Sequence, residues 1–220
     1  MTDTTTFDDV AAVMRAQTAG RRLRSDPLDD GTVLDLLELA SHATADHRLR
    51  CSFIVVRDPE VRHQLARTYR QGWSVYKRVL RTRSYSDAEL EARQWESDHF
   101  EDVPVHVVTC VEGRRPRFAG LRAAAFYAAA LPAVQNLRLA AGARGLGASA
   151  TMLPLWSTWE ARRTLRLPRR ITPVAVVALG WPRGGGTAAP TPPIGNLVHL
   201  DRYGHQPFRA QPGPSRPDTA

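Results

Sequence analysis

The sequence predicts an α+β fold in which helices flank a sheet. Three runs rich in aliphatic and β-branched residues are typical of buried strands, at residues 51–57, 103–111 and 173–179. Segments with the apolar spacing of helices lie before and between them. With 220 residues, 43% of them hydrophobic, the chain can bury a substantial core. We find no internal repeat or domain boundary, and we expect a single domain over residues 1–209 and a disordered tail over residues 210–220.

The rest of the chain is organised around the apolar segment 119–155. It begins with a run of good helix formers, residues 119–143, in which charges are nearly absent. A helix that is apolar on almost every face is buried in a core or against a partner subunit. Pro132 lacks an N–H group and predicts a kink inside the helix. Gly145 suits the left-handed conformation that ends a helix, and residues 148–153 follow as an expected strand.

A glycine motif follows this helix and allows two interpretations. Residues 145–150 read GLGASA and fit the G-x-G-x-x-G/A pattern of dinucleotide binding. That pattern requires a strand before it and a helix after it, so that the pyrophosphate meets a helix N-terminus. Here the order is reversed. We therefore favour a helix end followed by a strand, which explains both glycines.

The helix and the glycine motif together resemble the nitroreductase family of flavin enzymes. The residues that carry the resemblance are Phe126-Tyr127-Ala128, Gln135-Asn136-Leu137-Arg138-Leu139-Ala140-Ala141 and Gly145-Leu146-Gly147. The resemblance implies a nitroreductase-like fold with a mixed sheet flanked by helices, in an intertwined homodimer whose interface includes this helix. It also implies that the following strand lies beside the isoalloxazine ring of FMN. The expected cofactor-binding residues there are Thr151, Met152 and Leu153.

The segment from Arg15 to Pro27 resembles the phosphate-binding segment at the N-terminus of that family. Guanidinium groups suit a phosphate because they give bidentate, charge-assisted hydrogen bonds. The resemblance implies cofactor-binding roles for Thr18, Gly20, Arg21 and Arg22. From the residues alone, a solvated basic turn is the other interpretation.

Two further segments match the family in position. Residues 43–50, ATADHRLR, stand where the family has A-P-S-x-x-N-x-Q-P-W, and Thr44 and His47 are the residues expected to bind the cofactor. Residues 197–204, LVHLDRYG, resemble a C-terminal arm that crosses to the partner subunit in the family. The basic residue that usually precedes this arm and reaches the FMN phosphate is missing, and Pro192 and Pro193 occupy the area.

Local signals define the remaining elements. Residues 30–42 form an expected amphipathic helix with an apolar side made of Val33, Leu34, Leu36, Leu37 and Leu39. Asp58 is placed to cap a helix that runs to about residue 81, and Ser157 with Glu160 forms a capping box that opens another. The charged residues 83–101 are expected to form a mobile flap. In the family this region covers the substrate pocket, which makes Trp73, Tyr76 and Trp95 candidate lining residues; core packing is the alternative for each.

Composition excludes several classes of function. The formal net charge is +8, carried by scattered arginines and the single lysine Lys77, with no basic block interleaved with aromatics. We therefore expect a solvated basic surface and no nucleic-acid partner. No uncharged apolar run of 18 residues is present, so no membrane segment is expected. Two isolated cysteines and seven histidines without metal-ligand spacing predict no metal site, and a reducing cytoplasm as the location.

The resemblance implies an FMN-dependent oxidoreductase. NAD(P)H would reduce the flavin, and the flavin would reduce a small molecule such as a nitro compound or a quinone. The flavin carries such chemistry, so no side chain is given a catalytic role. Two alternatives stay open. The chain could bind flavin weakly or sequester it, or it could be a flavin-dependent oxidase or dehydrogenase of natural-product biosynthesis.

Overall fold

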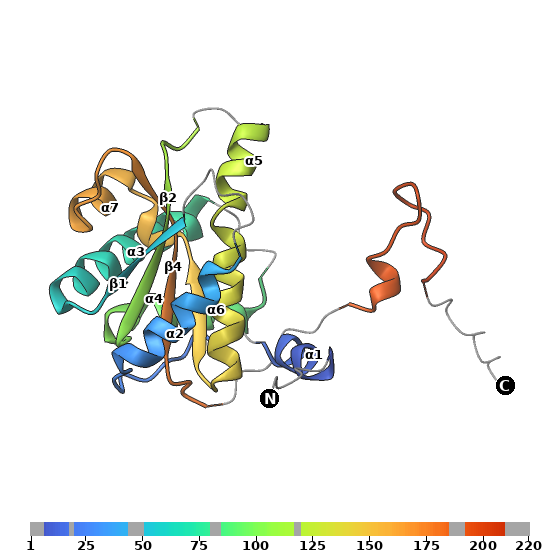
Figure 1. The fold of residues 1–220 in the computed structure, drawn as a ribbon, viewed down its shortest axis with the longest axis horizontal. Helices are drawn as coiled ribbons and strands as arrows, with labels where there is room; N and C mark the ends of the chain where they lie inside the picture. The colour runs from blue at the N-terminus through green and yellow to red at the C-terminus, as the bar shows by residue number, and fades with distance from the viewer. Residues whose placement is uncertain are drawn as a thin grey trace. The chain divides into compact units, whose positions relative to one another are not determined.

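The computed structural model describes residues 7–17, 20–43, 51–79, 85–116, 120–184 and 192–209. The chain divides into two units, residues 1–188 and 189–220, and each is described by itself. The larger unit contains the sheet and helices α1 to α7 (Figure 1).

Four strands form one sheet in the order β1-β2-β4-β3, and each neighbouring pair is antiparallel. The strands are β1 (Cys51–Val56), β2 (Val105–Glu112), β3 (Gly147–Thr151) and β4 (Ile171–Gly180). All four predicted strands are therefore confirmed, with ends that differ by a few residues. The prediction of a mixed sheet is wrong for the described strands, because every pair among them is antiparallel.

Side chains of the two central strands alternate between the two faces of the sheet, as the two-residue period of a strand requires. On β4, Val177 and Leu179 join the core on one face, whereas Val176 and Ala178 join the core on the other. Such strands bury both faces, which explains why they read as continuous apolar runs.

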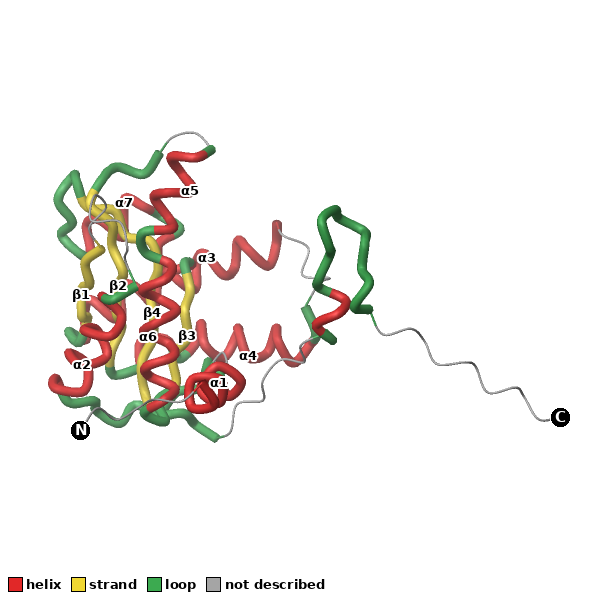
Figure 2. The backbone as a smooth tube through the Cα atoms, turned by 45° about the vertical axis from the view of Figure 1, so that its right-hand side comes forward, coloured by secondary structure: helices red, strands yellow, loops and turns green. Residues whose placement is uncertain are grey.

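Helices α2 (Asp30–Ser41) and α6 (Leu131–Ala143) cover one face of the sheet and lie side by side in Figures 1 and 2. Asp29 caps α2 through a hydrogen bond of 2.7 Å from the Thr32 N–H group to its carboxylate. The buried side of α2 consists of Val33, Leu36 and Ala40. Leu34 and Leu39 are exposed by 63% and 51%, so their predicted place on the buried side is wrong: the true stripe is narrower, with i, i+3 and i+7 spacing.

The apolar helix expected over residues 119–143 is broken into α5 (Leu121–Ala128) and α6. Pro132 lies in the first turn of α6, where a missing N–H group costs nothing because that group has no partner inside the helix. Gly145 ends α6 at φ +71°, and the Leu146 N–H group donates to the Ala141 carbonyl oxygen at 2.9 Å. Gly145 thus ends α6 as predicted. The predicted kink at Pro132 is wrong, because the proline lies at the start of a second helix and not inside one continuous helix.

Helix α3 (Pro59–Val79) covers the opposite face, and α4 (Asp87–Asp98) packs beside it (Figure 2). The expectation of a mobile flap over residues 83–101 is wrong for residues 85–101. Ser86 and Glu89 form a complete capping box that opens α4, and Phe100 is buried in the core below α3. The S-x-x-E pattern of Ser86 and Glu89 is present in the sequence, but the high charge of the segment favours the prediction of a flap.

The shorter elements of the larger unit complete these layers. They are α1 (Phe7–Ala16), α7 (Thr158–Thr164), and the 3-10 turns η2 (Phe100–Asp102) and η3 (Leu153–Leu155). In the smaller unit, η4 (Ile194–Asn196) precedes a turn in which the rings of His199 and Tyr203 stack with their centroids 4.3 Å apart.

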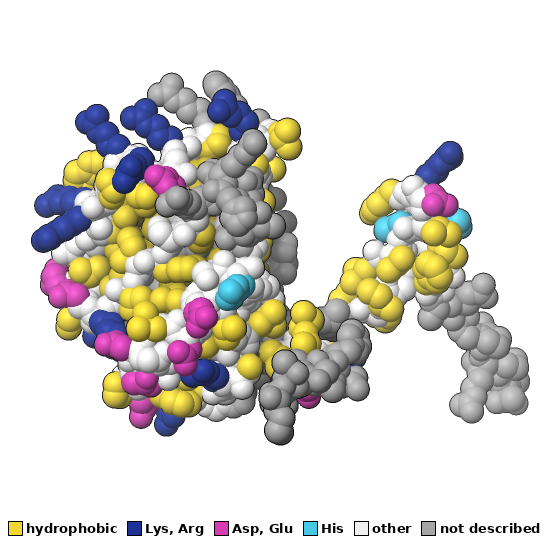
Figure 3. All heavy atoms as spheres, viewed as in Figure 1, with side chains coloured by type: hydrophobic (Ala, Val, Ile, Leu, Met, Phe, Trp, Pro, Cys, Tyr) yellow, Lys and Arg dark blue, Asp and Glu magenta, His cyan; other side chains and the backbone are white. Residues whose placement is uncertain are grey.

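Charge is unevenly spread over the surface of the larger unit. Figure 3 shows Lys and Arg side chains along its upper and left margin, near α7, and hydrophobic side chains across the middle of the same view. The arginines of the α7–β4 turn, Arg166, Arg169 and Arg170, are exposed, as expected of a solvated basic surface.

Candidate cofactor site

The segment that holds the predicted phosphate-binding arginines is fixed by backbone pairing at the end of β4. The Arg24 N–H group donates to the Trp181 carbonyl oxygen at 2.8 Å, and the Arg183 N–H group donates to the Arg22 carbonyl oxygen at 2.8 Å. These two bonds form an antiparallel bridge centred on Leu23 and Pro182. The segment that carries the two consecutive arginines is therefore tied to the end of β4 by backbone hydrogen bonds.

Two glycines allow this segment to cross the start of β3. Gly20 has φ +51°, and a Cβ atom added to it would lie 2.9 Å from the Ala148 nitrogen atom. Gly147 has no room for a Cβ atom either, because the Leu23 side chain occupies that space. The second glycine of the G-L-G motif thus permits close approach of the N-terminal segment. The motif combines a helix end with a crossing point and forms no dinucleotide loop.

Arg21 points toward a buried carboxylate. Its Nε atom lies 3.3 Å from Oε2 of Glu96, which comes from α4 and is 5% exposed. The Ser149 hydroxyl group of β3 donates a hydrogen bond to the other carboxylate oxygen. Burial raises the pKa of Glu96, and the Ser149 hydrogen bond and the charge of Arg21 oppose that effect. Glu96 therefore joins α4, β3 and the N-terminal segment in one polar cluster.

Tyr69 of α3 belongs to the same cluster. Its ring is buried, and its hydroxyl group interacts with both Glu96 and Thr151. Burial and the neighbouring charge of Glu96 raise the pKa of Tyr69 above its ordinary value. Through Tyr69 and Glu96, the structure brings the predicted residues Arg21 and Thr151 into a single network.

Arg22 lies apart from this cluster and is exposed. One of its Nη atoms lies 3.0 Å from Oε1 of Glu91, also on α4. Both predicted arginines therefore meet carboxylates of α4. Sequence reasoning missed Glu91 and Glu96, since it placed no ordered element at these positions.

The residues expected beside the isoalloxazine ring lie at the end of β3 and in η3. Thr151 is partly buried, and its hydroxyl oxygen accepts a hydrogen bond of 3.3 Å from the Leu153 N–H group. Met152 is 52% exposed, and Leu153 packs against the core cluster that contains Trp73. The other predicted cofactor-binding residues, Thr18, Thr44 and His47, lie outside the described residues.

Arg138 of α6 carries an unusual polar atom. Its side chain is half-buried, and its Nε atom is buried without a hydrogen-bond partner among the described residues. An Nη atom donates to Oε1 of Gln135 at 3.2 Å, and Gln135 donates in turn to Gln17 at 3.0 Å. Burial lowers the pKa of Arg138, and the nearby positive charge of Arg21 lowers it further. No sequence signal singled out this residue.

A hollow of about 470 Å³ lies between α3 and α4. Trp73 and Trp95 line it, whereas Tyr76 stacks against Trp73 with ring centroids 5.7 Å apart. The Lys77 ammonium group donates to Oε1 of Gln94 at 2.6 Å, and the Trp73 indole N–H group donates to the same oxygen at 2.8 Å. Trp73 is also only 2% exposed, so it serves the core as well as the hollow.

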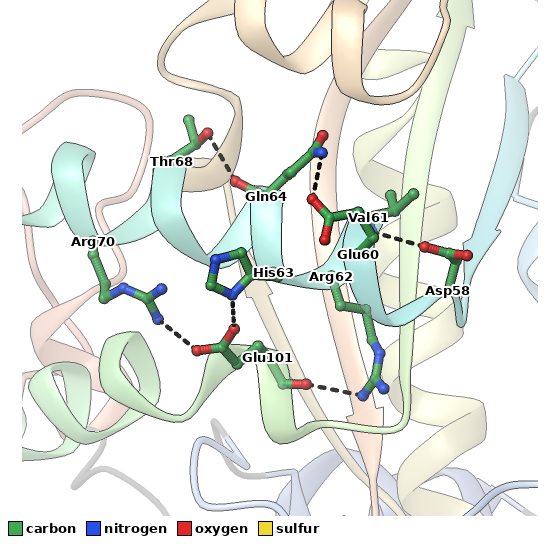
Figure 4. A network of polar contacts seen from close by, with 9 residues as sticks. All are labelled: Asp58, Glu60, Val61, Arg62, His63, Gln64, Thr68, Arg70 and Glu101. Carbon is green, nitrogen blue, oxygen red and sulfur yellow. Dashed lines mark hydrogen bonds and ion pairs between the residues drawn. The ribbon is translucent and has the colours of Figure 1, made fainter.

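A second polar network joins α3 to η2, the turn that follows the C-terminal end of α4 (Figure 4). Glu101 lies between His63 and Arg70, with oxygen-to-nitrogen distances of 2.5 and 3.2 Å. An Nη atom of Arg62 donates to the carbonyl oxygens of Glu101 and Val103 at 2.9 and 2.8 Å. Although burial raises the pKa of Glu101, the His63 hydrogen bond and the charge of Arg70 lower it overall. Arg62 thus fixes the main chain of η2, which is a structural role.

A match to a known protein family decides the classification. The model of the nitroreductase family matches residues 14–181, which include the arginine segment, α6 and β3. The chain belongs to the nitroreductase family. The family resemblance predicted from the sequence is thereby confirmed, and α6 with its G-L-G end lies inside the matched region.

Solved structures with a nitroreductase-type fold agree with this assignment. Iodotyrosine deiodinase bound to FMN and 3-iodo-L-tyrosine is 17% identical, with a TM-score of 0.69 over 88% of this chain and 98% of that chain. A nitroreductase of Desulfovibrio desulfuricans in complex with FMN is 22% identical, with a TM-score of 0.66 over 90% and 99%. A nitroreductase-like protein from Bacillus cereus is 19% identical, with a TM-score of 0.63 over 90% and 98%. No curated protein matches the chain significantly.

Three further features concern only the part of this nitroreductase-family chain that the structure describes. No cluster of three potential metal ligands occurs there. None of the described helices combines the length and apolar character needed to cross a membrane. Burial raises the pKa of Cys51 to about 11 and that of Cys110 to about 12, so both thiols stay protonated near neutral pH.

Proposed function

We propose that the chain is an FMN-dependent oxidoreductase in which NAD(P)H reduces the flavin and the flavin reduces a nitro compound, a quinone or a similar acceptor. The match to the nitroreductase family over residues 14–181 carries this proposal. Two of the solved structures reported above contain FMN. When bound, FMN supplies the electron-transfer chemistry, and the protein supplies binding, orientation and access.

The described residues fit the chemistry of this cofactor. The FMN phosphate is an anion, and the site offers Arg21, Arg22 and a buried guanidinium nitrogen of Arg138 for which no described residue is an acceptor. We assign Gly20, Arg21 and Arg22 to the phosphate and Thr151, Met152 and Leu153 to the ring. Thr18, Thr44 and His47 remain proposed cofactor contacts outside the described residues.

The hollow between α3 and α4 is our proposed acceptor pocket. Leu153, just after β3, belongs to the same core cluster as Trp73, which lines the hollow. Flat aromatic side chains such as Trp73 and Trp95 favour a planar, conjugated acceptor.

We further propose an intertwined homodimer. Leu121 of α5 is 86% exposed and Leu131 of α6 is 40% exposed, on the helices that the sequence predicts to be buried on most faces. In the smaller unit, Ile194 and Tyr203 are exposed by 74% and 93%. Apolar surfaces of this kind favour association, and a second copy of this chain is the partner we propose.

A second candidate function is that of a weak flavin binder or a flavin store. Both Arg21 and Arg22 face carboxylates, and a carboxylate beside a phosphate site opposes the binding of a second anion. This observation favours lower FMN affinity than a site lined by free arginines would have.

One experiment separates these functions. The purified protein is titrated with FMN, and the complex is then mixed anaerobically with NADH or NADPH while its visible absorption is followed. We expect bleaching of the flavin band, and its return when a quinone or a nitroaromatic compound is added. Bound flavin that is not bleached by either nucleotide would support a flavin store. Absence of FMN binding at any tested concentration would overturn both proposals.

A further inference from the structure

Arg138 and Arg21, both partly buried, come from two segments that meet at the candidate site: Gln135, one turn before Arg138, donates a hydrogen bond of 3.0 Å to Gln17, four residues before Arg21. Arg138 comes from α6, and Arg21 comes from the segment that crosses the start of β3. They are close enough for the charge of Arg21 to disfavour the protonated form of Arg138. Two guanidinium groups that repel each other while partly desolvated are unfavourable unless an anion lies between them.

Both side chains keep donors that no described residue accepts. Arg138 has a buried Nε atom without a partner, although a guanidinium group carries five N–H donors. Arg21 contacts Glu96 through its Nε atom at 3.3 Å, and this contact leaves its Nη donors for another acceptor. Leaving the buried Arg138 donor without an acceptor is costly, and an anion with several oxygens would supply acceptors to both side chains.

We propose that Arg138 is the second cation of the phosphate site, and that Arg138 and Arg21 together clamp the phosphate monoester of FMN. This inference rests on the proposed flavin function. Under this proposal, Arg138 on α6 binds the phosphate in place of the basic residue that the family resemblance puts ahead of the C-terminal arm. In this chain Pro192 and Pro193 stand there instead.

The surroundings hold the two guanidinium groups in place. Leu137 and Ala141 are fully buried and fix α6 against the sheet, so that the direction of Arg138 is set by the helix. Gln135 accepts a hydrogen bond from Arg138 and is itself anchored to Gln17 at the end of α1. Glu96 orients Arg21 through the contact between its carboxylate and the Arg21 Nε atom at 3.3 Å, and is therefore a positioning residue.

The test compares FMN with riboflavin, which lacks the phosphate. Each is titrated into the full-length wild type, Arg138→Met, Arg138→Lys and the control Arg67→Met, with binding followed by quenching of flavin fluorescence. Methionine keeps most of the length of arginine and is a good helix former. Arg67 is exposed on α3, so this control removes the same charge from a helix on the other face of the sheet.

We expect Arg138→Met to raise the Kd of FMN roughly 10- to 150-fold, the effect of losing one hydrogen bond to a charged group, and to leave the Kd of riboflavin unchanged. Arg138→Lys should recover part of the loss, and Arg67→Met should bind both flavins as the wild type does. Inorganic phosphate should raise the melting temperature of the wild type but not that of Arg138→Met.

Three outcomes count against the inference. Equal losses of affinity for FMN and for riboflavin would show that Arg138 acts through the folding of the protein and not through the phosphate. Unchanged FMN affinity in Arg138→Met, with normal binding by the wild type, would overturn the clamp and leave the flavin function intact. A wild type that binds neither flavin would overturn both the clamp and the function on which it rests.

Discussion

The Nε atom of Arg21 lies 3.3 Å from a carboxylate oxygen of Glu96, a residue that is almost fully buried in α4. This ion pair joins the segment predicted to bind phosphate to a helix that the sequence did not predict. It also orients Arg21, because the Ser149 hydroxyl group holds the other carboxylate oxygen. Glu96 therefore influences both the stability of the fold and the direction of the proposed phosphate ligand.

Glu96→Gln should change how stability depends on pH. Burial raises the pKa of Glu96 from its ordinary value of 4.5, so the folded state retains the proton at pH values where the unfolded state has lost it. The unfolding free energy of the wild type should therefore fall as the pH rises from 4.5 through the folded-state pKa, and this component should vanish in Glu96→Gln. Urea unfolding from pH 4.5 to 8 measures the slopes. Glu91→Gln, on the same helix but exposed, is the control, and equal slopes for wild type and Glu96→Gln would contradict the prediction.

Gly20→Ala should destabilise the protein more than Gly145→Ala. Both glycines have positive φ angles, +51° and +71°, so alanine is strained at either position. At Gly20 the added Cβ atom would also lie 2.9 Å from the Ala148 backbone nitrogen, whereas at Gly145 it would meet open space. We expect the free energy of unfolding to fall by about 1 kcal/mol in Gly145→Ala and by more in Gly20→Ala. Chemical denaturation gives both values, and a Gly20→Ala loss no larger than the control would show that the crossing segment can move.

Ala125→Glu should dissociate the proposed dimer without unfolding the subunit. Ala125 is exposed on α5, whereas Ala129, one turn further, is 8% exposed and packs against Val111 and Val174. A charge at Ala125 would be placed only at the proposed interface, and a charge at Ala129 would be buried inside the subunit. Sedimentation should therefore give a folded monomer for Ala125→Glu, and Ala129→Glu should show a much lower melting temperature. A wild type that sediments as a stable monomer at micromolar concentration would refute the dimer.

His106→Leu should make the protein less sensitive to acid. His106 is fully buried against Phe100, and burial lowers its pKa from 6.5 to about 3, with the charge of Arg62 adding to the effect. Between these pH values the unfolded state binds a proton that the folded state does not, so the unfolding free energy of the wild type falls as the pH falls. The slope of this component approaches about 1.4 kcal/mol per pH unit. Unfolding curves at pH 4, 5, 6 and 7 should show a shallower acid loss for His106→Leu, and parallel profiles would contradict a neutral buried imidazole.

Several elements were predictable because their signals are local. Asp58 caps α3 through a hydrogen bond of 3.0 Å from the Val61 N–H group, and Ser157 caps α7 through the Glu160 N–H group. Gly145 ends α6 through its own left-handed backbone conformation, and Pro132 suits the first turn of α6 because it lacks an N–H group. The errors have physical causes too. Leu34 is apolar but faces solvent, since burial depends on which side of α2 meets the sheet.

The sequence by itself determined the family, the four strands, the starts of α3 and α7 and the glycine end of α6, because caps, turn glycines and apolar periodicity act over three or four residues. Only the tertiary structure decided the contacts of Arg21, since Glu96 and Arg138 come from segments far from it in the sequence. Their effects follow from distance and burial, because a charge interacts with whatever the fold places within a few ångströms of it. If the same basic segment lay alone on the surface, it would be a solvated turn. It is a candidate phosphate site because α4, α6 and β3 lie next to it.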